Sequence, residues 1–267
     1  APHCEPCVLG KQAAVPFPAS TDDNVPKLIV HTDVMGPLPE TYGGARYAAT
    51  YLDGDTGRAW VRLVKGRDEV TSTTIEMMKL IICARGAPTR ILRSDNGTEY
   101  LTKELKRYLS GEGVRHETTA PYTPPQNGAA ERLNRTLQER TRALLADADA
   151  DPRLWGEALT TVNYVRNLSP IKGRDKTPWE AFHGTKPNVD HLRVWGCKAY
   201  VLIPKAQRYT KFEPITWPGI FIGYAHEDGT KAYRVKLDDG KIKISRNVVF
   251  VENPLPDRAR LDDDDTG

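Results

Sequence analysis

Three acidic residues have a placement that could serve metal-ion chemistry. We expect Asp33 to close the first strand, Asp95 to close the fourth, and Glu131 to lie in the first turn of a long helix. If the two strands are neighbours, both aspartates emerge at the carboxyl edge of the sheet, where open sheets commonly place ligands. Converging carboxylates repel one another and need a cation, and their oxygens are preferred ligands of Mg²⁺. A pair of such ions would suit phosphoryl transfer.

A purely structural explanation of these acids is also available. Aspartates are common in turns because their side chains bind nearby backbone N–H groups. Glutamates are common in the first turn of a helix because of the helix dipole. Spacing alone leaves both explanations open.

The hydrophobic pattern predicts the elements that would carry these residues. Three strands in succession, followed by alternating helix and strand, are typical of an α/β domain with a mixed five-stranded sheet and helices on both faces. We expect strands at 27–32, 47–52, 59–64, 90–94 and 114–118, and helices at 68–84, 103–112, 129–146 and after Pro152.

Beyond His191 the composition changes to short β-rich segments, expected at 198–203, 219–224, 231–237 and 241–251. The predicted organisation is a polar segment with a linker (1–26), the α/β core with a helical extension (27–190), a small β-rich C-terminal unit (191–256) and an acidic linker (257–267).

The charge balance is weakly basic. The formal net charge is +3, and the segment 257–267 contains five Asp and two Arg, so the remainder carries +6. This bias is compatible with phosphate binding but does not require it. No apolar stretch approaches the length of a membrane span, and the N-terminus shows no signal peptide. We therefore expect no membrane partner.

The long predicted helix carries a second polar set. Glu131, Arg135, Gln138 and Arg142 follow at offsets of four, three and four, so they share one face. They could be a solvated face with a Glu131–Arg135 pair, or they could contact the backbone of bound DNA. We favour DNA contact because the helix begins at the candidate metal site. The basic and aromatic residues of 193–217 leave the same two alternatives open.

Several motifs together resemble the catalytic core of Ty1/copia-type retrotransposon integrases, members of the retroviral integrase superfamily. They are HTDVMGP (31–37), LRSDNGTEY (92–100) and TAPYTPPQNGAAERLNRTL (119–137), with thirty-five residues between Asp95 and Glu131. The likeness continues through NYVRN (163–167), TPWEAFHGTKP (177–187), HLRVWGCKAYV (191–201) and IFIGY (220–224). The resemblance implies a ribonuclease H-like fold, with Asp33, Asp95 and Glu131 binding two Mg²⁺ or Mn²⁺ ions.

The resemblance also bears on two further segments. It implies that the loop 122–128 approaches the end of the element's DNA, with Gln126 and Asn127 touching the terminal nucleotides. Cys4 and Cys7 have zinc-ligand spacing but are half of a tetrahedral site. By resemblance they end a His-His-Cys-Cys zinc module whose histidines lie upstream, so we expect an incomplete Zn²⁺ site in a fragment of a polyprotein.

The expected activity is DNA integration, in which 3′-hydroxyl ends of element DNA are joined to target DNA. The expected partners are terminal-repeat and target DNA and further copies of the chain on that DNA. We expect synthesis within a cytoplasmic polyprotein and action in the nucleus. Two alternatives remain: a metal-dependent nuclease of the same fold that uses water, and an inactive or domesticated nucleic-acid-binding module.

Overall fold

The computed structural model describes residues 28–118, 128–208, 210–225 and 232–252. Cys4, Cys7, Gln126, Asn127 and the acidic segment 257–267 lie outside the described residues. No helix within the described ranges is long and apolar enough to cross a membrane.

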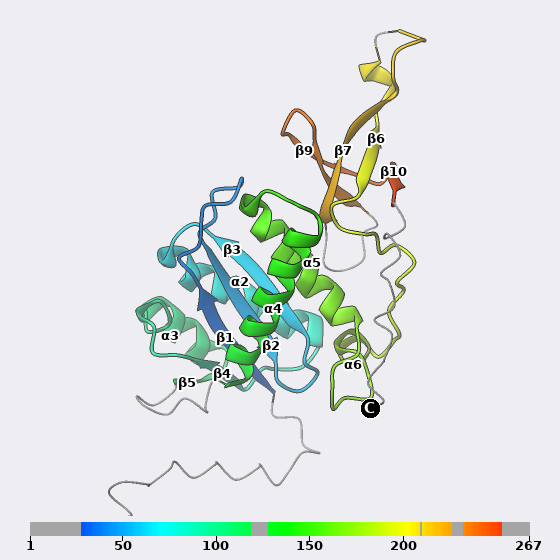
Figure 1. Cartoon of the computed structure of the whole chain (residues 1–267). Coiled ribbons are helices and arrows are strands. Elements are labelled where there is room, and N and C mark those ends of the chain that lie inside the picture. Colours follow the sequence, from blue (N-terminus) through cyan, green and yellow to red (C-terminus); the bar gives the residue numbers. More distant parts are fainter. Residues whose placement is uncertain (1–27, 119–127, 209, 226–231, 253–267) are drawn as a thin grey trace, which may run out of the picture.

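A mixed five-stranded sheet forms the core of the first half (Figure 1). Its order is β3-β2-β1-β4-β5, in which β1 is antiparallel to β2 and parallel to β4. The strands are β1 (Ile29–Met35), β2 (Tyr47–Asp53), β3 (Ala59–Val64), β4 (Ile91–Ser94) and β5 (Arg115–Thr118). The prediction that the first and fourth strands are neighbours is confirmed.

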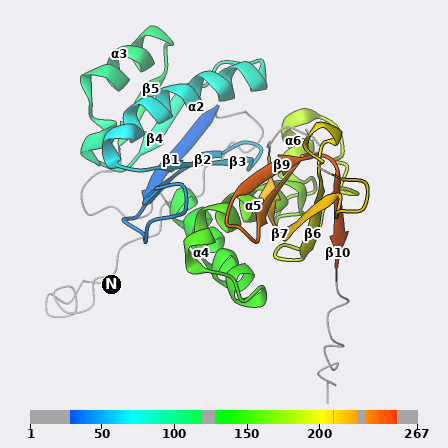
Figure 2. The same ribbon diagram turned by 90° about the horizontal axis from the view of Figure 1, so that it is seen from above.

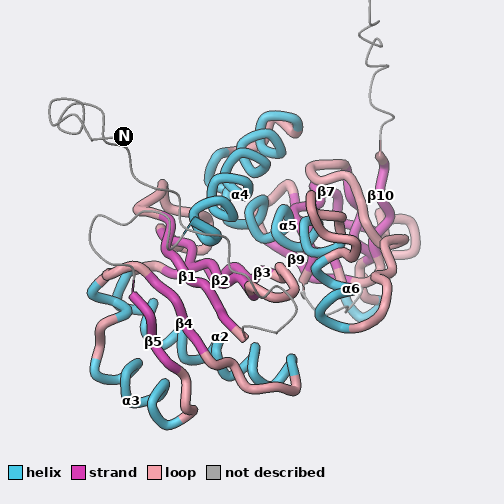
Figure 3. The backbone as a smooth tube through the Cα atoms, turned by 90° about the horizontal axis from the view of Figure 1, so that it is seen from below, coloured by secondary structure: helices cyan, strands magenta, loops and turns pink. Residues whose placement is uncertain are grey.

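Helices cover both faces of this sheet, as Figure 2 shows. On one face, α2 (Val70–Arg85) and α3 (Lys103–Gly111) bury Met78, Ile81 and Leu105 against β1, β2 and β4. On the other, α4 (Gly128–Asp147) and α5 (Trp155–Leu168) bury Leu137 and Leu159 against β2 and β3 (Figure 3). The predicted fold class is therefore confirmed.

Local chemistry sets the helix boundaries. Thr102 begins α3 by accepting a hydrogen bond at Oγ1 from the Leu105 N–H (3.3 Å), which satisfies a donor without a partner inside the helix. Gly86 ends α2 in the left-handed region (φ 65°), where a side chain would be strained. The short helix α6 (Pro178–His183), which the pattern did not predict, begins after Thr177 with Pro178 in its first turn and ends at Gly184.

Two strand predictions need correction. Asp33 does not close β1, which continues to Met35 because Val34 and Met35 still pair with Ala49 and Ala48. The segment 241–251 is not one strand but two, β9 (Ile242–Ser245) and β10 (Val248–Val251), separated by Arg246 and Asn247. Apolar residues alternate in the same phase on both sides of this break (Ile242 and Ile244, then Val248 and Phe250), so the pattern did not reveal it.

The C-terminal region forms a second five-stranded antiparallel sheet in the order β10-β6-β7-β8-β9. Its other strands are β6 (Lys198–Leu202), β7 (Thr216–Tyr224) and β8 (Tyr233–Leu237). This sheet does not pack by itself. Its core of Phe221, Ile222 and Val235 also includes Leu154 and Ala158, where α5 begins.

Two glycines allow the second sheet to approach the helices closely. A Cβ on Gly223 (φ +146°) would lie 2.7 Å from Thr161 Oγ1 on α5. A Cβ on Gly196 (φ +81°) would lie 2.5 Å from Ala148 Cβ, just after α4. In addition, Arg234 of β8 donates two hydrogen bonds to the Glu157 carboxylate of α5, at 2.9 and 2.7 Å. The second sheet is therefore fixed against both helices.

We expect Gly223→Ala to lower the free energy of unfolding by roughly 2–4 kcal/mol, because it adds a clash with Thr161 to backbone strain. Gly240→Ala is the matched control, since Gly240 also has positive φ (+86°) but no atom within 4 Å of the added Cβ. It should cost about 1 kcal/mol from strain alone. Urea unfolding of both variants measures the difference, and equal losses would show that the close approach contributes nothing.

Candidate active site

Asp33 presents a half-buried carboxylate from within β1, opposite Thr50 of β2. Its Oδ1 accepts a hydrogen bond from the Val34 N–H at 2.8 Å, and its Oδ2 accepts one from Asn134 Nδ2 at 2.9 Å. The site residue is therefore held by its own strand and by α4.

Asn134 links α4 to the sheet and was missed by sequence reasoning. Its amide donates to Asp33, while its Oδ1 accepts a hydrogen bond from Thr50 Oγ1 at 2.8 Å. A signal existed, because Asn134 lies on the buried stripe of α4 and a buried amide needs partners. It also lies three residues after Glu131, so both side chains lie on neighbouring parts of the helix surface.

Asp95 directly follows β4, as predicted. The parallel register pairs His31 with Arg93, so two residues further on Asp33 and Asp95 reach the same level of the sheet. Asp95 Oδ1 accepts a hydrogen bond from the Gly97 N–H at 3.0 Å. A Cβ on Gly97 would lie 2.8–3.0 Å from the Glu99 and Asp95 carboxylates, so a larger residue here would displace one of these acids.

Glu131 lies exposed in the first turn of α4, as predicted. Burial is the largest influence on Asp33, and together with the negative charges of Asp95 and Glu131 it raises the pKa of Asp33 to about 6, despite its two hydrogen bonds. Asp95 and Glu131 therefore each lie near enough to Asp33 to disfavour its charged form. None of them forms an ion pair with a described Lys or Arg. Within the described ranges, however, no group of three His, Cys, Asp or Glu is already arranged to hold a metal ion.

The proposed DNA-facing residues of α4 are all exposed. Arg135, Gln138 and Arg142 lie on the solvent side, while Ala130, Leu133, Leu137 and Thr141 form the buried stripe. The Glu131–Arg135 ion pair of the alternative explanation is absent from the ion pairs among described residues. Arg135 and Arg142 thus carry positive charge along the same exposed side of α4 as Glu131.

The basic segment of the C-terminal sheet is also exposed. Lys205 and Lys211 face solvent, and Phe212 is 100% exposed. Lys243 Nζ lies 4.9 Å from the ring centre of Trp217. These residues offer cations and aromatic rings to a partner, but nothing in their arrangement specifies which one.

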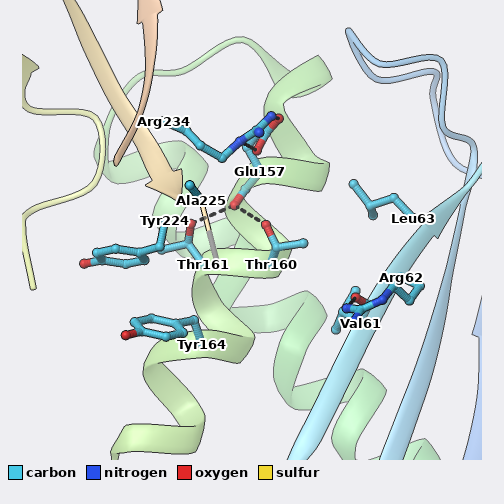
Figure 4. Close-up of a pocket in the computed structure, with 10 residues that line it drawn as sticks. All are labelled: Val61, Arg62, Leu63, Glu157, Thr160, Thr161, Tyr164, Tyr224, Ala225 and Arg234. Atoms are coloured by element: carbon cyan, nitrogen blue, oxygen red, sulfur yellow. Dashed lines mark hydrogen bonds and ion pairs between the residues drawn. The ribbon is translucent and has the colours of Figure 1, made fainter. Parts of the chain in front are cut away.

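A cavity of about 270 Å³ lies between β3, α5 and the C-terminal sheet (Figure 4). Leu63, Thr160, Tyr164 and Tyr224 contribute to its wall, and the Glu157–Arg234 ion pair lies at its edge. It borders β3, whereas Asp33 lies on β1, two strands away. The cavity is therefore separate from the acidic site.

Comparisons with known proteins agree with the fold. Residues 23–124 match the family model "Integrase core domain", and residues 197–263 match "Retroviral polymerase SH3-like domain". A chain of the simian T-cell lymphotropic virus intasome, solved in complex with PP2A regulatory subunit B56 gamma, superposes with a TM-score of 0.50. It is 19% identical, and the match covers 86% of this chain and 81% of that one, so it shows the fold alone.

Proteins similar in sequence indicate the group of integrases to which the chain is related. The chain is 38% identical over 263 residues to a retrovirus-related Pol polyprotein from transposon TNT 1-94 of Nicotiana tabacum, covering 97% of this chain and 20% of that protein. It is 31% identical over 258 residues to the Pol polyprotein from transposon RE1 of Arabidopsis thaliana, covering 95% and 17%. The chain thus spans about a fifth of the length of these relatives.

Fold and family models together define an integrase core domain followed by an SH3-like domain of retroviral type. The chain belongs to the integrase family, and over most of its length it is similar to a segment of the Pol polyproteins of Ty1/copia-type plant transposons.

The raised pKa of Asp33 predicts how the free energy of unfolding changes with pH when a chelator keeps the protein free of divalent ions. Between the ordinary value of 3.8 and about 6, the folded state retains a proton that the unfolded state has lost, so stability falls as pH rises through this window. Asp33→Asn removes the titrating group. Urea unfolding in EDTA measures the free energy of unfolding of the variant and of the parent. The difference between them, variant minus parent, should rise by about 2 kcal/mol from pH 4 to pH 7. A difference that does not change with pH would show that the pKa of Asp33 is not raised.

Proposed function

We propose that this chain joins 3′-hydroxyl ends of element DNA to target DNA, with Asp33, Asp95 and Glu131 binding two Mg²⁺ or Mn²⁺ ions. The observation that supports this proposal is the placement of Asp33 on β1 and Asp95 after β4 at the same level of the sheet, with Glu131 three residues before the amide that binds Asp33, in a chain whose residues 23–124 match the integrase core domain. The donors are hard oxygen atoms, and no described cation neutralises them. These features fit divalent ions.

The chain's own groups would assemble the site in a defined way. Asn134 holds the Asp33 carboxylate toward α4, and the Gly97 N–H holds Asp95 in its turn. Bound divalent ions would activate the attacking hydroxyl and stabilise the leaving oxygen. In the reaction, the element's 3′ oxygen forms a bond to a target phosphorus and the target's 3′ oxygen leaves. One phosphodiester bond replaces another, so no covalent protein intermediate is required.

DNA would lie along the exposed side of α4. Arg135 and Arg142 would contact phosphates, with Gln138 between them. Gln126 and Asn127, outside the described residues, remain proposed contacts to terminal nucleotides. Assembly of several copies on DNA, action in the nucleus after synthesis in a polyprotein, and completion of the Cys4–Cys7 zinc site by upstream histidines also belong to this proposal.

Metal binding should depend on all three acids. We expect Asp33→Ala, Asp95→Ala and Glu131→Gln each to weaken Mn²⁺ binding at least tenfold in calorimetric titration, because each removes a charged ligand. Glu139→Gln is the matched control, being an exposed glutamate two turns further along α4. Unchanged titrations for all three acid variants would refute the metal site.

Catalysis and DNA binding should separate. Asp95→Asn preserves shape but replaces an ionised ligand by an amide, so strand transfer should be abolished while DNA affinity at fixed salt changes less than threefold. Arg135→Ala with Arg142→Ala should weaken DNA binding and reduce its salt dependence, leaving Mn²⁺ binding intact.

Labelled DNA ends, incubated with Mg²⁺ or Mn²⁺ and protein that includes the upstream zinc module, measure joining and cleavage together. Cleavage without joining would favour the nuclease alternative, and binding without either reaction would favour the inactive module. Joining by Asp95→Asn at the parental rate would place the chemistry elsewhere.

A further inference from the structure

Two arginines from separate segments bind the turn between β2 and β3, and a third on α4 adds its positive charge to theirs. Arg140 lies on α4, Arg166 in the last turn of α5, and Arg174 in the segment that follows α5. Arg140 and Arg174 are the neighbouring charges that act on Arg166. We call these residues the arginine cluster.

Backbone carbonyls of the turn hold two members of the cluster in place. Arg166 Nη1 donates to the Gly57 carbonyl at 2.9 Å. Arg174 Nη2 donates to the Gly54 carbonyl at 3.0 Å, and its Nη1 donates to the Asp55 carbonyl. Gly57 (φ +75°) has no side chain to displace the guanidinium, since a Cβ there would lie 3.2 Å from Arg174 Cζ. Both forks are thus oriented before any ligand arrives.

Among the described residues, no acid is paired with the cluster. None of its members forms an ion pair with a described residue. The Asp55 carboxylate accepts instead from the Leu28 N–H and lies 3.9 Å from Arg85, and Asp175 forms no ion pair within the described ranges. Burial, followed by the charges of Arg140 and Arg174, lowers the pKa of Arg166 to about 10. Gathering these charges costs free energy that a bound anion would recover.

We infer that the arginine cluster is a binding site for a phosphate group. Guanidinium forks match phosphate oxygens in bidentate geometry, and preoriented forks lose little freedom on binding. The phosphate could belong to a DNA backbone or to a free phosphate ion, and the two arms of the experiment distinguish these sources.

The cluster is distinct from the proposed strand-transfer site. Arg140 follows Glu131 by nine residues, which places the two on opposite sides of α4, about 180° apart at 3.6 residues per turn. A phosphate here would therefore lie on another flank of the helix from Arg135 and Arg142. The inference does not rest on the proposed function.

The first arm titrates inorganic phosphate into the full chain in EDTA, at constant ionic strength. We expect Arg140→Gln with Arg174→Gln to weaken phosphate binding at least tenfold, while Arg166 keeps its bond to the turn. The matched control is Arg90→Gln with Arg107→Gln, two exposed arginines remote in sequence from the cluster, which should alter the affinity less than twofold. Melting temperatures of all three proteins report folding.

The second arm measures duplex DNA affinity against salt in the Asp95→Asn background, so that no strand transfer can contribute. If DNA supplies the phosphate, the cluster variant should lower the slope of log affinity against log salt by about one relative to the control. Loss of phosphate binding with unchanged DNA binding supports the site and assigns it to free phosphate. The inference is overturned if the folded cluster variant matches the control in both arms.

Discussion

A hydrogen bond between a helix and a strand organises the proposed catalytic region. Asn134 on α4 donates to the Asp33 carboxylate on β1 and accepts from Thr50 on β2, so one buried amide joins three elements. Since Glu131 lies three residues earlier, the bond also sets where the third acid lies. A buried amide without partners is costly, which makes other positions of α4 unfavourable.

The position of α4 in turn determines that of the C-terminal sheet. α5 packs along α4, and the second sheet completes its core with residues from both helices. The absence of side chains at Gly196 and Gly223 allows this contact, and the Glu157–Arg234 pair orients it. The exposed basic residues of the second sheet are therefore held in a defined place relative to Asp33. A ligand that spans both domains would meet a preformed surface and would lose little freedom in aligning them.

Much of the fold could be predicted from the sequence because its signals are local. Alternating apolar residues, and turns such as Asp95-Asn96-Gly97, marked the strands of the core, and the stripe through Leu133 and Leu137 marked α4. The structure confirms that the strands of Asp33 and Asp95 are parallel neighbours, which the sequence order left conditional.

Asn134 was missed because its role depends on partners 84 and 101 residues away. The break at Arg246 was missed because apolar residues keep the same alternation on both sides of it, although β9 and β10 lie at opposite ends of the strand order. The arginine cluster likewise combines three segments whose proximity no local pattern encodes.

Two sets of like charges lie on opposite sides of α4, with acids on one side and arginines on the other. Elsewhere, several buried or half-buried charges are paired, as Asp53 is with Arg85 and Glu157 with Arg234. Asp33, Asp95 and Glu131, the acids of the proposed metal site, form no ion pair with a described Lys or Arg, and the arginine cluster on the other flank of α4 forms none with a described acid. Pairing these groups within the chain would relieve both repulsions, yet each set is held apart by bonds to neutral partners: Asn134 for Asp33, and turn carbonyls for Arg166 and Arg174. An arrangement that forgoes such pairing leaves each charge available to an external ligand of opposite sign. Divalent cations and phosphate groups, the two components of a phosphoryl-transfer reaction, are the ligands that these two sets of side chains best complement.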